Sequence, residues 1–562
     1  MNVFLSSVLS AGYKACCSLR FNVLTVLVIG IALLVSAPVL FVLSSIFSDS
    51  GEIWRHLATT VLPRYIINSF ELMIGVGSGV VVIGVSTAWL VTMCRFPGSR
   101  LFESALLLPL AAPAYLLAYT YTDVLEYFGP IQTTLRQVFG WNSAGDYWFP
   151  NVRSPLGAIV MLTLVLYPYV YLLTRVAFLE QSVRTLEASR SLGCGPWRSF
   201  FTIALPLARP AIIAGLALAL METLNDFGTV EYFSVPTFTT GIYRTWFGLG
   251  ERMAAAQLAA VLMMFIFGLI LLERWSRRQA RYYQGSSRYE QLSVYQLQGV
   301  RAAIAGLTCL LPIGLGLLLP AGLLLQMTLK HADKTLDQSF WQLAVNSLIL
   351  ATITAGVAVV IALIVAYSLR LYANPGMRLG ARIAAMGYAV PGSVIAVGVL
   401  IPLGRFDSAL NSWLRSTLGL SVGLLVSGTV AALIFAYLVR FLAVALSTIE
   451  SSLTKIKPTL DDAARSFGYG PTQTLLRVHA PLMWGSLLTA VMLVFVDVMK
   501  ELPATLVMRP FNFDTLAIRV YQYASDERLI EAAAPALAII LVGLLPVIFL
   551  SLQIARSRAR AS

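Results

Sequence analysis

Four carboxylates at the ends of long apolar stretches are the side chains best suited to handle an ion: Glu222, Asp226, Asp497 and Glu501. Carboxylates near the end of a membrane helix are costly and usually face a partner or a wet cavity. One interpretation is a substrate path for a hard cation, which prefers oxygen ligands. The interpretation that we favour is a salt bridge or a helix-end contact, for example to Arg244 and Arg519.

Other residue types predict neither catalysis nor a resident metal. The five cysteines have no metal-type spacing, and we interpret them as small packing residues. The three histidines, His56, His331 and His479, lie far apart. A nucleotide-binding P-loop needs G-x-x-x-x-G-K-[ST], and the sequence contains no Gly-Lys pair. We therefore expect no catalytic residue, metal or cofactor in this chain, and any ATP hydrolysis that it depends on would belong to separate subunits.

The composition shows which kind of element must position these side chains. Of the 562 residues, 58% are hydrophobic and 12% are charged, against about 45–50% and 25% in soluble domains. A soluble globule cannot bury so much apolar surface, and helices satisfy their backbone hydrogen bonds within lipid. We expect an all-α polytopic membrane protein. The net charge of +13 fits basic loops that face lipid head groups rather than a nucleic-acid site.

Long apolar runs predict about twelve membrane-spanning helices, since one span needs about 20 apolar residues. The runs lie near 23–46, 66–94, 101–121, 156–178, 202–224, 254–272, 302–328, 343–369, 381–403, 419–447, 482–499 and 530–554. The first run is too long for a signal-peptide core, so we expect an uncleaved helix. The basic segment 273–281 and the basic tail predict that both termini are cytoplasmic.

The two halves of the sequence repeat each other. Asn68 recurs as Asn346 (346 − 68 = 278), and Gly193 recurs as Gly468 (468 − 193 = 275). An ordered series of such matches predicts two parallel six-helix repeats, with the helices near 23–46 and 302–328 at the periphery. The expected divisions are an N-terminal segment with the first helix, repeat 1, a basic linker with the seventh helix, repeat 2 and a basic tail, at 1–59, 60–275, 276–339, 340–555 and 556–562.

A loop between the fourth and fifth runs of each repeat combines an acidic residue, small residues, a glycine and prolines. The two copies consist of Glu187, Ala188, Ser189, Gly193, Pro196 and Pro206, and of Asp462, Ala463, Ala464, Gly468, Pro471 and Pro481. The glycine can take positive φ after a helix. The first proline suits the first turn of the next helix, and the second would bend the chain as it enters the membrane. The pattern predicts a short helix, a break and a second helix.

This duplicated pattern resembles the EAA loop of the permease subunits of ABC importers, in which Glu-Ala-Ala is followed by three residues, Gly and a later Ile-x-Leu-Pro. The first copy departs from the motif at Ser189 and the second at Asp462, and Val478 and Ala480 replace the usual Ile and Leu. The resemblance implies a MetI-like type I importer fold in a bacterial inner membrane. It also implies that each loop docks into a groove on an ATPase subunit and transmits its closure.

From about residue 60 onward, the chain is similar to the fused, double-length permeases of ferric-iron importers. The similarity includes 222–229 and 497–505, the segments that hold the four carboxylates. It implies one copy of this chain per transporter, two ATPase subunits, a periplasmic binding protein, surrounding membrane lipids and no nucleic acid. Permeases for thiamine, phosphonate or polyamine remain alternatives for the substrate.

A twelve-helix secondary transporter is the rival class. Such carriers often have a Gly/Asp/Arg-rich loop between helices two and three, which segment 94–100 matches poorly. The paired acidic loops would also have no role in such a carrier. No filter-like segment indicates a channel, and no converging Ser/His/Asp arrangement indicates an enzyme.

Overall fold

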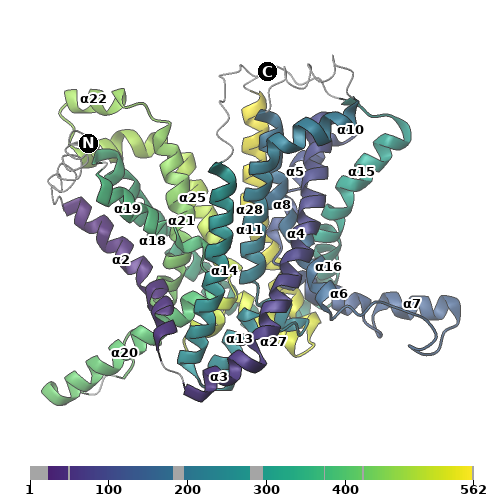
Figure 1. The fold of residues 1–562 in the computed structure, drawn as a ribbon, viewed down its shortest axis with the longest axis horizontal. Coiled ribbons are helices and arrows are strands. Elements are labelled where there is room, and N and C mark those ends of the chain that lie inside the picture. The colour runs from purple at the N-terminus through teal and green to yellow at the C-terminus, as the bar shows by residue number, and fades with distance from the viewer. Residues whose placement is uncertain are drawn as a thin grey trace, which may run out of the picture. The chain divides into compact units, whose positions relative to one another are not determined.

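The computed structural model describes residues 23–48, 51–180, 195–278, 295–372, 374–420 and 423–559. Helices make up 83% of the structure (Figure 1). Within the described ranges, the strands are β1 (Cys94–Arg95) and β2 (Tyr295–Gln296), which pair in parallel. The all-α prediction is confirmed.

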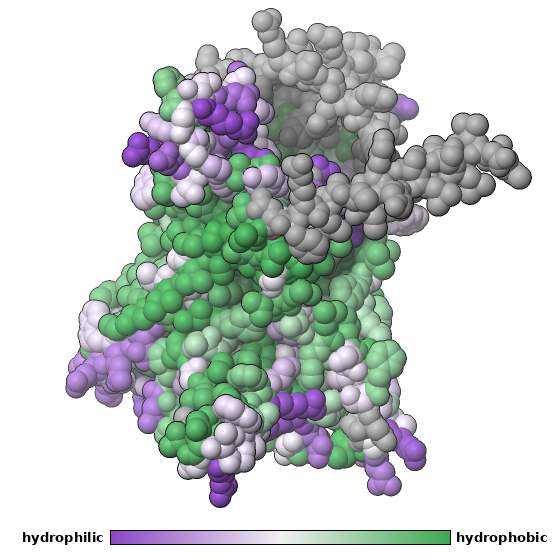
Figure 2. All heavy atoms as spheres, turned by 90° about the vertical axis from the view of Figure 1, so that its left-hand side faces the viewer, coloured by the Kyte–Doolittle hydropathy of each residue, from purple (hydrophilic) through white to green (hydrophobic). Residues whose placement is uncertain are grey.

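The described helices confirm a polytopic membrane protein. Ten of them are long and apolar enough to cross a membrane. Two further pairs of helices qualify together but are bent by 89° and 80° at short breaks, so the count reaches twelve if each pair is one span. These pairs are Ser99–Ala111 with Ala114–Phe139 and Pro471–Leu482 with Trp484–Met499. In Figure 2, hydrophobic side chains form a broad band across the middle of one face, with groups of hydrophilic side chains above and below it.

The chain forms two compact units. The first joins Met1–Phe47 to Ser347–Phe513, and the second joins Ser48–Asn346 to Asp514–Ser562. The boundary falls inside α18. The helices of the first unit are α2 (Val23–Ser44), α18 (Gln338–Leu371), α19 (Pro375–Ala384), α20 (Gly392–Leu418), α21 (Val430–Thr454), α22 (Thr459–Ser466), α23 (Pro471–Thr474), α24 (Ala480–Leu482), α25 (Trp484–Met499) and α26 (Pro503–Met508).

The second unit contains the helices between α2 and α18 together with the last two helices of the chain. They are α3 (Gly51–Thr60), α4 (Leu62–Met93), α5 (Ser99–Ala105), α6 (Ala114–Leu125), α7 (Pro130–Phe139), α8 (Pro155–Glu180), α10 (Pro196–Ser199), α11 (Leu205–Asn225), α12 (Gly228–Tyr232), α13 (Phe238–Tyr243), α14 (Arg252–Arg278), α15 (Gly299–Ile313), α16 (Leu319–Lys330), α17 (Ala332–Thr335), α27 (Leu516–Ser525) and α28 (Leu529–Ala559).

In the first unit, α2 packs on helices that lie more than 300 residues later in the sequence. It contacts α19 and α20. An added Cβ at Gly398 of α20 would lie 2.5 Å from the carbonyl oxygen of Pro38, so the two helices approach closely there. Asn374 Nδ2 also donates to Thr25 Oγ1 at 3.2 Å. The first helix of the chain is therefore held by residues of predicted repeat 2.

In the second unit, the α15–α16 pair packs on residues of predicted repeat 1. It contacts α4, α5 and α6. The Tyr121 hydroxyl donates to the Leu315 carbonyl at 2.6 Å, and an added Cβ at Gly316 would lie 2.8 Å from the carbonyl oxygen of Leu164. α16 also packs on α28, which lies in predicted repeat 2, so this pair contacts both repeats.

Glycines allow α4 to approach α8 closely. An added Cβ at Gly75 would lie 2.5 Å from Ile159, and one at Gly79 would lie 2.7 Å from Thr163. Small residues let membrane helices pack backbone to backbone. At the equivalent positions of α18, 278 residues later, the chain carries Ile353 and Val357. These two side chains are 46% and 38% exposed, so α18 presents bulky side chains where α4 has a close-packed surface.

Equivalent hydrogen bonds occur in both predicted repeats. Asn68 Nδ2 donates to the Pro236 carbonyl at 2.8 Å, and Asn346 Nδ2 donates to the Asp514 carbonyl at 3.3 Å. Both bonds span 168 residues. Each asparagine anchors the segment that precedes a short helix, α13 in one copy and α27 in the other. The sequence repeat is thus also a repeat of local structure.

Candidate functional site

The second of the two predicted loops forms a short helix, a break and another helix, as the sequence predicts. Gly468 has φ of +78° and lies two residues after the end of α22. Its N–H donates to the Arg465 carbonyl at 2.9 Å, and the Tyr469 N–H donates to the Ala464 carbonyl at 3.0 Å. These bonds satisfy the last carbonyls of α22. Pro471 is the first residue of α23, so the predicted roles of the glycine and the proline are confirmed in this copy.

One face of α22 is open to solvent. The side chain of Asp462 is 71% exposed and forms a 3.4 Å ion pair with Arg465, which is 68% exposed. Phe467, next to Gly468, is 81% exposed. Ala464 is buried, whereas Ala463 is exposed. The short helix and the residue that follows it therefore expose one acidic, one basic and one aromatic side chain, and aromatic and arginine side chains are enriched at protein interfaces.

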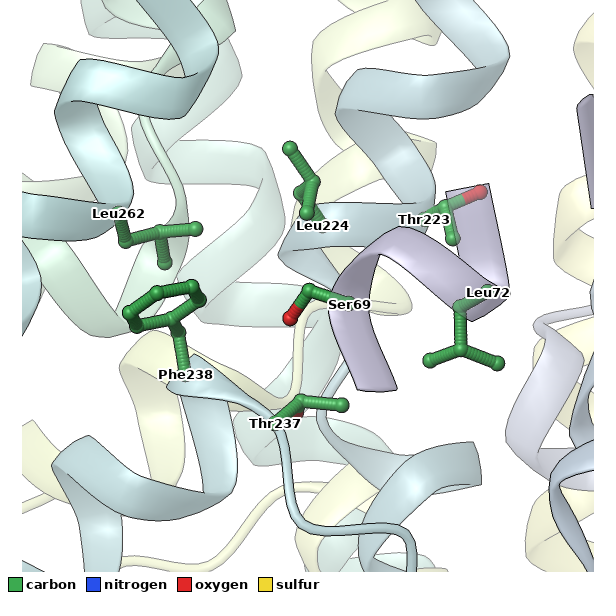
Figure 3. Close-up of a pocket in the computed structure, with 7 residues that line it drawn as sticks. All are labelled: Ser69, Leu72, Thr223, Leu224, Thr237, Phe238 and Leu262. Carbon is green, nitrogen blue, oxygen red and sulfur yellow. The ribbon is translucent and has the colours of Figure 1, made fainter. Parts of the chain in front are cut away.

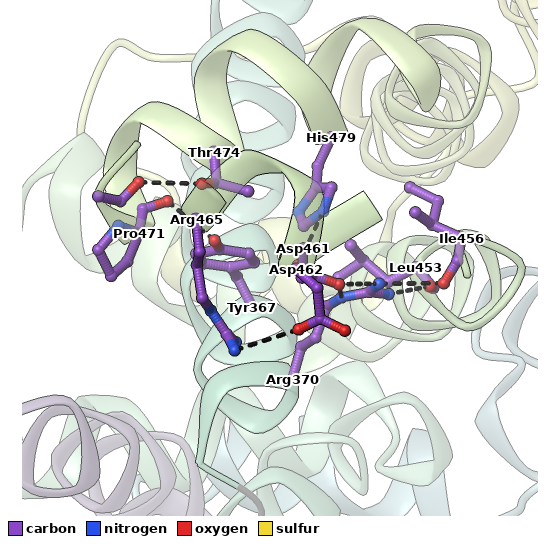
Figure 4. Close-up of polar contacts among 11 residues, drawn as sticks. Tyr367, Arg370, Leu453, Ile456, Asp461, Asp462, Arg465, Pro471, Thr474 and His479 are labelled. Carbon is purple, nitrogen blue, oxygen red and sulfur yellow. Dashed lines mark hydrogen bonds and ion pairs between the residues drawn. The ribbon is translucent and has the colours of Figure 1, made fainter. Parts of the chain in front are cut away.

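The opposite side of α22 is held by Arg370 at the end of α18 (Figure 4). Arg370 Nη2 and Nε donate to Asp461 Oδ2 at 2.6 Å and 3.2 Å. The same guanidinium donates to the carbonyls of Leu453 and Ile456 at 2.5 Å and 3.0 Å. Arg370 thus connects α18 to the end of α21 and to α22. The Arg370 and Asp461 side chains are only 16% and 14% exposed.

His479 and Tyr367 extend this network into the next helical segment (Figure 4). His479 Nε2 lies 3.1 Å from Asp461 Oδ1, and the imidazole is fully buried. The Tyr367 hydroxyl donates to the Pro471 carbonyl at 2.8 Å, and its ring lies 5.5 Å from the imidazole, edge to face. Both ends of the loop are therefore attached to α18.

A π-helical turn precedes the second proline of each loop. The turns are Phe200–Ala204 before Pro206 and Leu475–His479 before Pro481. In the second copy the chain then bends by 80° before α25, whereas Trp197–Asn225 counts as one span. π-turns inside helices are rare and often mark functional sites. The second copy thus bends at Met483, two residues after Pro481, whereas the bend predicted at Pro206 is absent from the first copy.

The first loop is described only in part. Glu187, Ala188, Ser189 and Gly193 lie outside the described residues. Pro196 begins α10, as predicted, and Pro206 lies in the first turn of α11. Beside the π-turn, the Trp89 ring packs 4.8 Å from the ring of Phe200 and 5.5 Å from that of Phe178. Trp89 corresponds to Tyr367 of the second copy (367 − 278 = 89), so an aromatic side chain occupies this position in both copies.

Two of the four carboxylates cap short helices. Asp226 accepts hydrogen bonds from the Thr229 and Val230 N–H groups, both at 3.1 Å, at the start of α12. Burial raises the pKa of Asp226, which follows the span Trp197–Asn225, to about 6. Glu501 accepts from the Ala504 N–H at 3.1 Å at the start of α26.

Glu501 also forms an ion pair with Arg440, in which Nη1 and Oε2 are 2.5 Å apart and the two side chains are 5–6% exposed. The other two carboxylates have weaker contacts. Asp497 lies 2.9 Å from Lys500 Nζ, and Glu222 accepts from Asn225 at 3.4 Å.

The arginines suggested as partners bind other acids. Arg244 pairs with Glu231, and Arg519 pairs with Asp514. The salt-bridge interpretation was therefore wrong about these two partners, although Glu501 and Asp497 do form ion pairs. Among the described residues, no group of three or more His, Cys, Asp or Glu side chains could hold a metal ion.

A small pocket lies between α4, α11, α13 and α14 (Figure 3). Its volume of about 10 Å³ is near the lower limit for one water molecule. The hydroxyl-bearing residues Ser69, Thr223 and Thr237 line it together with Leu72, Leu224, Phe238 and Leu262. This pocket is too small to hold a transported solute.

The sequence analysis did not identify Arg370, Asp461, Tyr367 and Phe467 as parts of the site. Asp461 had a usable signal, because it directly precedes the acidic position of the loop. Nothing in the sequence marked Arg370, since it lies about 90 residues before Asp461 and is one of several basic residues in its part of the chain.

Comparisons with known proteins place this arrangement in a family. The family model for the "Binding-protein-dependent transport system inner membrane component" matches residues 80–278. The molybdenum transport system permease protein ModB of Escherichia coli K12 is 32% identical over 204 residues, which are 35% of this chain and 86% of ModB. The sulfate transport system permease protein CysT of the same organism is 28% identical over 158 residues, which are 27% of this chain and 52% of CysT.

The similarity to a ferric-iron permease covers almost the whole chain. The Fe(3+)-transport system permease protein FbpB 2 of Haemophilus influenzae is 27% identical over 540 residues, which are 94% of this chain and 97% of FbpB 2. The chain belongs to the family of inner membrane components of binding-protein-dependent transport systems. It is a multi-pass ABC permease of the fused, double-length type and resembles the permeases of ferric-iron importers.

Proposed function

We propose that this chain supplies both permease halves of an ATP-driven importer that moves ferric iron across the inner membrane by alternating access. A periplasmic binding protein delivers the iron, and one copy of the chain binds two separate ATPase subunits, which hold ATP and Mg²⁺. The two halves correspond to repeats 60–275 and 340–555. Both termini and both loops face the cytoplasm, in keeping with the basic linker and tail.

The geometry of α22 carries the proposal that the loops couple transport to ATP hydrolysis. α22 has eight residues, exposes Asp462 and is followed directly by the exposed Phe467. Its other side is fixed by the polar contacts between Asp461 and Arg370. A groove on an ATPase subunit can bind such a projecting helix, and a closing groove can then move α22 as a unit. We assign the same role to segment 187–196 of the first copy.

The end-to-end similarity to FbpB 2 supports iron as the substrate. The similarities to ModB and CysT cover only 35% and 27% of this chain, whereas the similarity to FbpB 2 covers 94%. Glu222 and Asp497 remain candidates for contact with the passing cation, because both are partly exposed. Asp226 and Glu501 support the path by fixing α12 and α26.

Uptake by cells tests the substrate. We expect a strain that lacks this chain to lose uptake of radioactive ferric iron when iron is scarce, and the restored chain to recover it. Molybdate, sulfate and thiamine uptake should not change between the two strains. Unchanged iron uptake, with loss of one of the other solutes, would keep the permease class and replace iron by that solute.

A further inference from the structure

Arg370 is the one described side chain through which α18 bonds to both α21 and α22. It makes two hydrogen bonds to Asp461 and one each to the Leu453 and Ile456 carbonyls. The carbonyls belong to the end of α21 and to the connection after it, where the helix leaves acceptors unsatisfied. A guanidinium that donates to both carbonyls and a carboxylate fixes the three segments relative to one another more tightly than a neutral hydrogen bond would.

The same network cannot form at the matching positions of repeat 1. The residue 278 positions before Arg370 is Thr92, and the residues 275 positions before Asp461 and His479 are Leu186 and Ala204. None of these three can ionise. Thr92 instead donates its hydroxyl to the Ala88 carbonyl of its own helix at 2.6 Å.

We propose that Arg370 and Asp461 form a clamp that positions α22 for its ATPase subunit, and that this clamp serves the second loop only. This inference rests on the proposed coupling role of the loops. Arg370 and Asp461 are positioning residues, since they act through α22 and need not touch the ATPase. The two ATPase subunits therefore bind unequal sites, one held by an ionic clamp and one supported by aromatic packing around Trp89.

The clamp explains how motion of α22 reaches the membrane. Asp461 lies in α22, Arg370 lies in the last turn of α18, and His479 lies in the π-turn that precedes the 80° bend. A displacement of α22 is therefore passed directly to two membrane segments. In repeat 1, two glycines of α4 let this helix pack closely on α8. α18 carries Ile353 and Val357 at the matching positions, so it depends on the Arg370 contacts instead.

Asp461→Asn tests the clamp, because it removes the charge and keeps the shape. We expect the purified full chain to bind its second ATPase subunit roughly tenfold more weakly, which is about 1.4 kcal/mol. Native mass spectrometry at a concentration that gives wild type two ATPase subunits should then show one. Backbone amides of α22 should exchange hydrogen roughly tenfold faster, whereas those of α8 and α11 should not change.

Two variants complete the test. Asp462→Asn removes the neighbouring charge, whose side chain is 71% exposed, and should leave the exchange of α22 unchanged. Arg370→Lys keeps the charge but loses the fork, and should give exchange between wild type and Asp461→Asn. Unchanged exchange of α22 in Asp461→Asn, or binding of both subunits with unchanged affinity, overturns the clamp. Wild type that binds no ATPase subunit overturns the proposed function instead, and exchange still tests the clamp.

Discussion

Arg440 of α21 and Glu501, just before α26, form an ion pair whose Nη1–Oε2 distance is 2.5 Å inside the first unit. The sequence singled out Glu501 as a possible ligand of the transported cation, and the structure gives it a partner and a helix to cap. The desolvation cost of two buried charges can offset their attraction, but loss of one partner leaves the other charge buried and uncompensated.

Arg440→Ala should therefore destabilise the chain by about 3–5 kcal/mol. Thermal unfolding of the purified chain in detergent measures the effect. Arg465→Ala is the matched control, because its pair with Asp462 is about two-thirds exposed, and exposed pairs contribute only about 0–1 kcal/mol. Equal losses in the two variants would contradict a structural role for the buried pair.

Gly392→Ala should disturb the same ion pair from another side. An added Cβ would overlap the Glu501 carboxylate and lie 2.9 Å from Arg440 Nη1. Overpacking of this kind costs about 1–3 kcal/mol, which should appear as a lower unfolding temperature. Gly404→Ala lies in the same helix with no atom within 4 Å of the new Cβ. This control should not lower the unfolding temperature, and a comparable drop there would show that the helix rather than the ion pair is sensitive.

Gly468→Val should impair transport without preventing membrane insertion. Its φ of +78° is left-handed, where a side chain costs about 1–2 kcal/mol, and the change would misplace α22. We expect ATP hydrolysis that loaded binding protein no longer stimulates. The control is Gly470→Ala, which has φ of −71° and open space around the new Cβ. We expect the same loss for Gly193→Val, and normal ATP-driven uptake in both valine variants would remove the main support for coupling through the loops.

Asn68→Ala and Asn346→Ala should have similar effects. Each removes a hydrogen bond to a carbonyl 168 residues later in the chain, with a net contribution of about 0.5–1.5 kcal/mol. Thermal unfolding should show two small losses of the same order. A large loss at one site and none at the other would mean that the two repeats do not use this bond alike.

The membrane class, the repeats and the helix break at Gly468 could be predicted because each depends on local sequence. Apolar runs define spans, and Gly468 and Pro471 have strong backbone preferences. The packing of α2 on α19 and α20 could not be predicted, because nothing in residues 23–46 specifies which half of the chain they contact. The clamp was missed for the same reason, since Arg370 and Asp461 meet only after α18 and α22 fold together.

The partners of the four carboxylates also depended on tertiary structure. Arg244 and Arg519 are at matching repeat positions, which made them reasonable partners for the four carboxylates. They instead pair with the nearer Glu231 and Asp514. Arg440 was not considered because it lies 61 residues before Glu501 in the middle of an apolar helix.

Reconstitution of transport tests the central claim most directly. The full chain, its ATPase subunits and iron-loaded binding protein would be combined in proteoliposomes, with radioactive ferric iron measured inside. We predict iron entry that requires ATP, with one copy of this chain per two ATPase subunits, and little entry when the chain carries Gly468→Val. Failure of ATP to drive iron entry by the wild-type chain, or equal entry with Gly468→Val, would contradict the account.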